Sequence, residues 1–105
     1  MVLTFVDASL ATICNSERRL VAQWGRDGFD RIGRRLGELA AVDGTDLEHL
    51  PSIDISNNPD GSVTLSFDRG DLMIHGVPTR RAEPIADIGR ADGLEIMAIE
   101  VTVDK

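Results

Sequence analysis

The chain has 105 residues, 42% of them hydrophobic and 28% charged, which suits one folded domain with one modest core. A formal net charge of −7 argues against a dedicated nucleic-acid binder, because binding to a polyphosphate relies on Lys and Arg. The single cysteine, Cys14, excludes an internal disulfide framework and indicates a reducing compartment. No apolar run approaches the roughly 20 residues of a membrane-spanning helix, and the first residues carry no basic leader, so we expect a cytoplasmic protein with no membrane partner.

The first predicted elements are a short β-strand over residues 2–6 and a helix that begins after Asp7, whose carboxylate can cap it. Apolar residues then recur at helical spacing as far as Trp24, and Ser16 can cap a fresh helical start within this stretch. Gly25 is expected to end the first helix, as glycine often does at a helix C-terminus.

A second helix is predicted over residues 28–42, because its apolar residues form one stripe. The stripe consists of Phe29, Ile32, Leu36 and Leu39. The other face carries Arg31, Arg34 and Arg35, which are candidates to bind a partner. Acidic residues four positions before and after Arg34 equally favour an ordinary solvated helix face.

The second half of the chain changes to the alternating pattern of β-strands. Strands are expected over residues 52–56, 62–67, 71–77 and 94–103, with turns at NNPDG and DRG between the first three. Residues 78–93 are predicted to form a long polar connection. One face of the last strand is expected to carry Met97, Ile99, Val101 and Val103.

The order β-α-α-β-β-β-β predicts a single α+β domain over residues 1–105, with two N-terminal helices packed on one face of a mainly antiparallel sheet.

Several stretches of the chain then match one protein family in order and spacing. They are the helix LATICNSERRLVAQWG, the helix end RRLGELAAVDGTDLEHLP, the later hairpin and the final strand IMAIEV. Over nearly its whole length the chain resembles a divergent member of the HigB-like, or plasmid maintenance killer, branch of the RelE/ParE toxin superfamily. The resemblance implies two helices on a curved antiparallel sheet, which is the RelE-like fold. It also implies a toxin of a toxin–antitoxin system, held in check by a helix-turn-helix antitoxin (HigA).

Many proteins of that family are endoribonucleases that cut messenger RNA on the ribosome without a metal. The resemblance implies that basic and polar side chains on the sheet and at the C-terminus bind phosphate and move protons. This chain departs from that pattern: residues 57–61 form a turn without Arg, Asp71 stands where relatives have an Arg, and the end is Val103-Asp104-Lys105. Because a carboxylate at residue 71 repels an RNA backbone, we expect the ribonuclease to be weakened or lost.

An active toxin would have to rebuild the basic set from His75, Arg80, Arg81 and Arg69. His75 is a candidate general acid or base, and Arg80 and Arg81 are candidates to clamp a phosphate. The alternatives are a structural histidine in a strand and a solvated pair of loop arginines. Lys105 could replace the terminal His of relatives, although a terminal Lys is usually mobile. The histidines and the cysteine are too scattered for a metal site, and we expect no cofactor.

The expected partner is the cognate helix-turn-helix antitoxin, with the ribosome and its messenger RNA as partners only of an active toxin, and a homo-oligomer as a further option. An alternative from another class is a non-enzymatic interaction domain whose acidic sheet docks a basic protein. Salt would weaken such a complex steeply.

Overall fold

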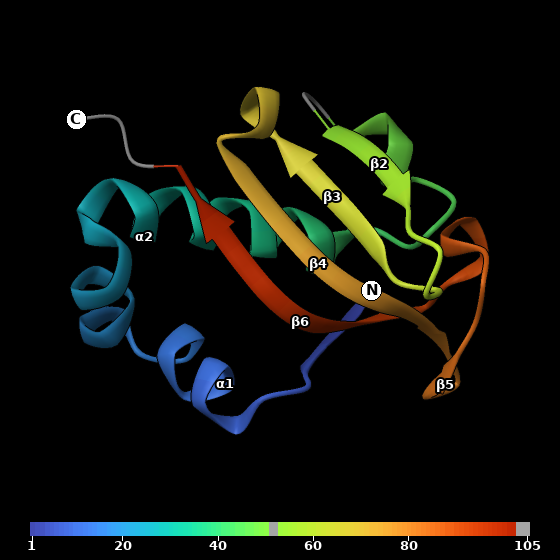
Figure 1. Cartoon of the computed structure of the whole chain (residues 1–105), viewed down its shortest axis with the longest axis horizontal. Coiled ribbons are helices and arrows are strands. Elements are labelled where there is room, and N and C mark those ends of the chain that lie inside the picture. Colours follow the sequence, from blue (N-terminus) through green and yellow to red (C-terminus); the bar gives the residue numbers. More distant parts are fainter. Residues whose placement is uncertain (51–52, 103–105) are drawn as a thin grey trace.

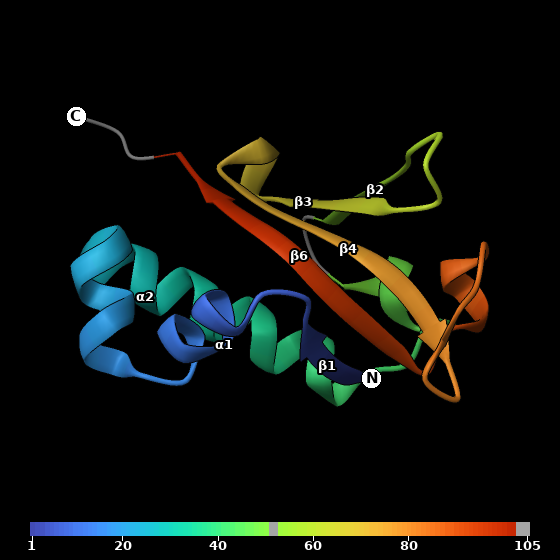
Figure 2. The same ribbon diagram turned by 60° about the horizontal axis from the view of Figure 1, so that its bottom comes forward.

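In the computed structural model, which describes residues 1–50 and 53–102, two helices lie on one side of a six-stranded sheet (Figures 1 and 2). The main elements are β1 (Val2–Phe5), α1 (Ala8–Cys14), α2 (Glu17–Ala41), β2 (Ile53–Asn57), β3 (Val63–Phe67), β4 (Leu72–Arg80), β5 (Glu83–Pro84) and β6 (Gly93–Val101). Three short 3₁₀ turns complete them: η1 (Leu47–His49), η2 (Asp68–Gly70) and η3 (Ile88–Arg90). The predicted α+β class, with helices on a sheet, is confirmed.

The sheet is mixed. Its strand order is β1-β6-β4-β3-β2, and β5 pairs with β4 outside that path. The first strand runs parallel to the last, with Leu3 opposite Leu94, whereas every other pairing is antiparallel. The predicted element order therefore lacked one strand, β5, and one parallel pairing.

The helical half begins at the two predicted caps. The Asp7 carboxylate accepts a hydrogen bond from the Ser9 N–H (2.7 Å), and the Ser16 hydroxyl accepts one from the Arg19 N–H (3.3 Å). Gly25 breaks the helical path at φ +77°, but the chain resumes a helix at once, so α2 is one kinked element up to Ala41. α1 and α2 are thus separated at Ser16, and Gly25, which is non-helical, ends the first helical segment of α2 as expected, before a second segment continues to Ala41.

The core lies between α2 and the sheet. Ile32 and Leu39 from the predicted stripe are fully buried, and Phe29 and Leu36 pack against the cluster at its border. The sheet contributes Val63, Leu65, Phe67, Leu72, Ile74, Leu94, Ile96 and Ile99.

A β-bulge in β6 changes the predicted face of the last strand. His75 lies opposite Ala98, but the next residue, Gly76, lies opposite Ile96, so Met97 has no partner in the ladder. Met97 is consequently 43% exposed, while Ile96 and Ile99 both face the core. The expectation that Met97 shares a face with Ile99 is wrong, because a bulge shifts the alternation by one residue. Val103 and Lys105 lie outside the described residues.

The predicted polar connection over residues 78–93 is also wrong in part. Strand β4 continues to Arg80, and a tight turn at Arg81 and Ala82, both at positive φ, leads into β5. The Asp92 carboxylate accepts the Arg81 N–H (3.1 and 3.2 Å) and so ties this turn to the start of β6.

Candidate functional site

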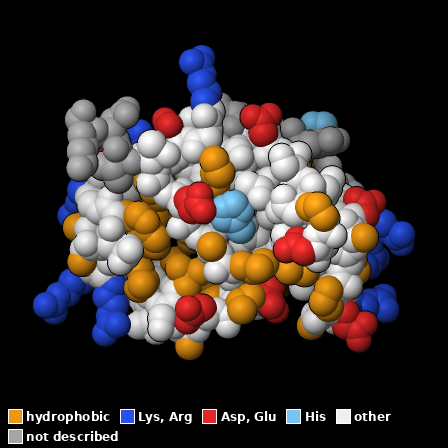
Figure 3. Space-filling view, in the orientation of Figure 1, with side chains coloured by type: hydrophobic (Ala, Val, Ile, Leu, Met, Phe, Trp, Pro, Cys, Tyr) orange, Lys and Arg blue, Asp and Glu red, His pale blue; other side chains and the backbone are white. Residues whose placement is uncertain are grey.

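The candidate site is the face of the sheet turned away from α2, which we call the open face. Register and alternating burial place on it Val2, Thr4, Asp54, Ser56, Thr64, Ser66, Met73, His75, Val77, Thr79, Glu95, Ala98 and Glu100. Figure 3 looks onto this face: apolar side chains gather in its lower half with acidic ones among them, and Lys and Arg side chains project at the rim.

The open face is acidic. Asp54, Glu95 and Glu100 are all exposed there. Among the strand residues that the structure describes, Arg80 is the one Lys or Arg, and it is the last residue of β4. Its guanidinium donates to the backbone carbonyl of Arg90 (3.1 Å) in η3, away from the centre of the sheet. An RNA backbone laid on this face would meet carboxylates without a compensating cation.

His75 lies near the middle of the open face, in a polar line that crosses two strands. Its Nδ1 is 2.9 Å from the Thr64 hydroxyl, which also accepts a hydrogen bond from the Asn58 side-chain amide (3.1 Å). We assign the Thr64 proton to the bond with Nδ1, which leaves Nε2 as the protonated ring nitrogen. Nε2 is 3.5 Å from the nearer Glu100 carboxylate oxygen and makes no hydrogen bond with the described residues.

This line has the residue types of a proton relay, but Nε2 makes no hydrogen bond to Glu100, and the line lacks a group that would stabilise an anion. A hydroxyl, an imidazole and a carboxylate in sequence are the parts of a nucleophile–base–acid set. Among the described strand residues, no Lys or Arg lies next to Thr64. None of them could therefore stabilise negative charge that develops on a substrate there. The line therefore serves the sheet as a cross-strand hydrogen-bond network.

The four candidate catalytic residues do not come together. Arg69 lies in η2 at one end of β4, and Arg80 and Arg81 lie at the other end. At about 3.3 Å per strand residue, His75 is roughly 16 Å along the strand from Arg80, and Arg69 lies in the turn beyond the other end of the strand. A phosphate held by one of these arginines would be out of reach of His75.

The candidate partner-binding arginines also separate. Arg34 is exposed, whereas Arg35 is buried, so the expected single exposed face is wrong for Arg35. The Arg35 guanidinium donates to Asp68 (2.7 Å) and Glu38 (2.9 Å) and lies over the Phe67 ring at 5.0 Å from its centroid. Burial by itself lowers the pKa of Arg35, but the hydrogen bonds to Glu38 and Asp68 outweigh it and the pKa is raised. Arg35 thus fastens α2 to the turn after β3.

Asp71 belongs to the same end of the sheet. Its carboxylate is 3.9 Å from the Arg31 guanidinium, and its carbonyl accepts the Thr102 N–H (2.7 Å). Asp71 therefore pairs with α2, and an arginine in its place would face Arg31. Arg31 is thus a structural partner for the carboxylate of Asp71, at the position where the family resemblance led us to expect an arginine.

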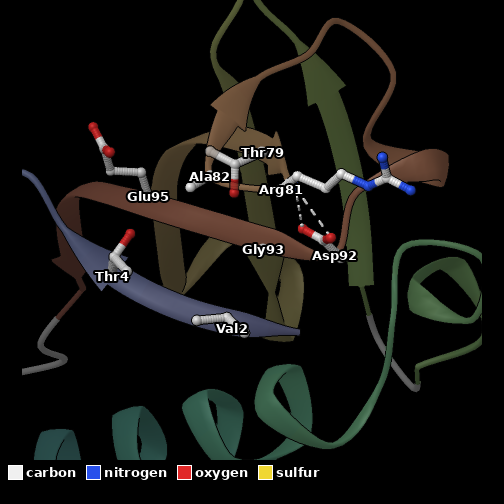
Figure 4. Close-up of a pocket in the computed structure, with 8 residues that line it drawn as sticks. All are labelled: Val2, Thr4, Thr79, Arg81, Ala82, Asp92, Gly93 and Glu95. Carbon is white, nitrogen blue, oxygen red and sulfur yellow. Dashed lines mark hydrogen bonds between the residues drawn. The ribbon is translucent and has the colours of Figure 1, made fainter.

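Two hollows border the open face along β1 and β6. The first, of about 540 Å³, lies where the β4–β5 turn bends over the sheet, and we call it the β1–β6 hollow (Figure 4). It is lined by Val2, Thr4, Thr79, Arg81, Ala82, Asp92, Gly93 and Glu95. In Figure 4 the Arg81 side chain extends away from Thr4 and Glu95. A Cβ on Gly93 would lie 2.6 Å from the Thr79 hydroxyl, so the floor requires glycine.

The second hollow, of about 270 Å³, lies between α1, the start of α2 and β6, and we call it the Trp24 slot. Leu10, Ile13, Trp24 and Met97 give it an apolar lining, with Asp7 at its rim. Cys14 is half-buried nearby in sequence, and burial raises the pKa of its thiol, which disfavours the nucleophilic thiolate.

Within the described part of the chain, no three His, Cys, Asp or Glu side chains are grouped so that they could hold a metal ion, and no helix there could cross a membrane. No protein-family model, curated protein or solved structure matches the chain.

Sequence reasoning missed Thr64 and Glu100 as neighbours of His75. A hairpin around DRG pairs Thr64 with His75, so this half of the network was accessible from the turn signal. Glu100 lies near His75 only because the bulge at Met97 shifts the register between β4 and β6. No pattern in the local sequence predicts this shift.

Proposed function

We propose that this chain is a HigB-like protein of the RelE/ParE superfamily whose messenger-RNA cleavage is weakened or lost, and which acts in the cytoplasm by binding a protein partner. The partner in that family is a helix-turn-helix antitoxin. The matching sequence stretches, and the arrangement of two N-terminal helices on one side of a sheet, support this assignment.

The acidic open face is the observation that carries the loss of activity. Cleavage through a ribose 2′-hydroxyl builds negative charge on phosphate oxygens, and catalysis requires preorganised cations or hydrogen-bond donors there. This sheet offers Asp54, Glu95 and Glu100 instead, and the arginines lie at the ends of β4. The same face is suited to a protein surface of opposite charge.

Translation measurements test the loss of activity. The chain is induced alone in a bacterial host and incorporation of labelled methionine is followed; purified chain is then added to programmed ribosomes and the messenger is mapped by primer extension. We expect normal synthesis and uncut messenger. If the messenger is cleaved, and cleavage disappears in His75→Ala or Arg80→Ala, the proposed loss of ribonuclease activity is wrong and the chain is an active toxin.

Partner binding is tested separately. The chain is co-expressed with a candidate helix-turn-helix antitoxin, and the complex is measured by size-exclusion chromatography and calorimetry. A stoichiometric complex is expected. If that protein does not bind while an unrelated basic protein does, with an affinity that falls steeply with salt, the chain is instead a non-enzymatic interaction domain.

A further inference from the structure

We propose that the β1–β6 side of the open face docks a cationic amphipathic helix presented by a protein partner. The inference rests on the proposed partner-binding function and names the chemistry of the bound segment. The docking surface, which we call the β6 strip, consists of Val2, Thr4, Val6, Glu95, Met97 and Ala98.

The β6 strip exposes large apolar side chains. Val2 is 67% exposed, Val6 57% and Met97 43%, and these are the exposed large hydrophobic residues of the described chain. They all lie on β1 or β6 or directly after β1, with Val6 and Met97 toward one end of the strip and Val2 at the other. Met97 belongs to the β6 strip because the bulge turns it out of the core.

The Trp24 slot continues this apolar surface. Met97 and Ala98 line it from the sheet, and Leu10, Ile13 and Trp24 line it from the helices. Its volume of about 270 Å³ suits one bulky apolar side chain of the partner. The slot gives the segment an anchor at one end of the strip.

The charges beside the strip select a basic partner. Glu95 lies on the strip, Glu100 follows on the same strand, and Asp7 stands at the rim of the Trp24 slot. Asp92 lines the β1–β6 hollow at the other end, where the Arg81 side chain turns away from Glu95 (Figure 4). Lys or Arg residues flanking an apolar face would meet these carboxylates, whereas an acidic segment would be repelled.

The geometry favours a helix over an added strand. β4 pairs with one edge of β6 along its length and β1 pairs with the other edge as far as Ile96, so a partner reaches the side chain of Glu95 from the face of the sheet. A helix laid on an uncovered sheet face buries an apolar stripe, as α2 does on the opposite side. Residues 93–98 span about 16 Å at 3.3 Å per residue, the length of a helix of about 11 residues.

The test uses a synthetic 14-residue peptide of Leu and Lys in an amphipathic helical pattern, with a Leu/Glu peptide of the same pattern as control. The ¹⁵N-labelled full chain is titrated with each, and binding is followed by amide shifts and by the fluorescence of Trp24, the one tryptophan of the sequence. The variants are Glu95→Lys and Met97→Glu. The matched control is Asp30→Lys, the same charge change on an exposed position of α2.

We expect shifts at Thr4, Glu95 and Met97 and a change in Trp24 emission with the Leu/Lys peptide. Glu95→Lys and Met97→Glu should each weaken binding at least about tenfold, and Asp30→Lys should stay within about twofold. Shifts on α2 or spread over the surface, equal losses in all three variants, or equal binding of the Leu/Glu peptide would each overturn the proposal.

The cognate partner separates this inference from the proposed function. If the helix-turn-helix protein binds wild type, Glu95→Lys and Met97→Glu alike, the strip is wrong and the toxin–antitoxin assignment stands. If the peptide maps to the strip but the helix-turn-helix protein does not bind, the strip stands and that assignment fails.

Discussion

The two faces of the sheet come from alternating residues of the same strands, yet their chemistry is opposite. In β4, Leu72 and Ile74 are fully buried under the helices, while Met73 and His75, which alternate with them, stay half-buried on the open face. The covered face holds one buried cation, Arg35, with its carboxylate partners. The open face holds exposed carboxylates and no such partner arginine among the described strand residues.

This difference separates stability from function. Arg35 closes the core where α2 meets the turn after β3. We therefore expect substitutions on the covered face to lower the free energy of unfolding most. Substitutions on the open face should change stability less, so this face can be adapted to binding. Four pairs of substitutions probe that division, from the largest expected effect to the smallest.

Truncating Phe67 should give the largest effect. Phe67 is fully buried and lies under the Arg35 guanidinium, so Phe67→Ala should lower the free energy of unfolding by about 3–5 kcal/mol. Met73→Ala, on the open face of the neighbouring strand, should cost less than about 1 kcal/mol. Urea denaturation followed by circular dichroism measures both. Equal losses of the free energy of unfolding in the two variants would contradict the expected difference between the two faces.

Removing the buried arginine comes next. Arg35→Met leaves the carboxylates of Asp68 and Glu38 without their cation and should cost about 2–3 kcal/mol. The matched change Arg34→Met, on the exposed side of α2, should stay within about 0.5 kcal/mol. Chemical denaturation compares the two variants. A neutral or stabilising Arg35→Met would show that a hydrophobic side chain serves as well at this position.

A pair of glycine substitutions should differ in sign. A Cβ on Gly76 would lie 2.9 Å from the Glu95 carbonyl oxygen and 2.9 Å from a Leu94 methyl, so Gly76→Ala should cost about 1–3 kcal/mol. A Cβ on Gly33 in α2 meets nothing within 4 Å, and Gly33→Ala should stabilise by about 0.5–1 kcal/mol. Thermal unfolding of both variants checks the signs. A stable Gly76→Ala would mean that β6 can slide away at the bulge.

The smallest effect concerns pH. Hydrogen bonds from the Ser62 hydroxyl and N–H lower the pKa of Asp60. A carboxyl whose pKa is lower in the folded state stabilises the protein above its unfolded value of about 3.9, and this contribution disappears as the pH falls through the folded pKa. Asp60→Asn should therefore flatten the acid limb of stability between about pH 5 and pH 2, measured by urea denaturation. Ser62→Ala should flatten it in the same direction, and an unchanged slope in both would remove Asp60 as a contributor.

Much of the local structure could be predicted because its causes are local. Asp7 and Ser16 cap helices through bonds within three residues, and the stripe from Phe29 to Leu39 follows the period of a helix. The hairpin of β3 and β4 follows from its turn, and with it the contact between Thr64 and His75.

The predictions that were wrong concern contacts between residues that lie far apart in the chain. The residues around Met97 do not predict a bulge, because the bulge is defined by how β6 pairs with β4. Arg35 lies three residues after Ile32 and four before Leu39, so the helical period already separates it from Arg34, but its partner Asp68 lies 33 residues later in the chain. The candidate set of His75, Arg69, Arg80 and Arg81 does not converge for a local reason instead: these residues are spread along one strand and the turns at its two ends.

The sequence by itself determined the α+β class, the caps, the core stripe and the acidic balance, since periodicity, turn chemistry and composition are read within a few residues. Only the tertiary structure decided that β1 lies parallel to β6, that Met97 faces outward and that the carboxylates gather on one uncovered face. These features depend on which distant strands become neighbours, and that is set by the burial of the whole core at once.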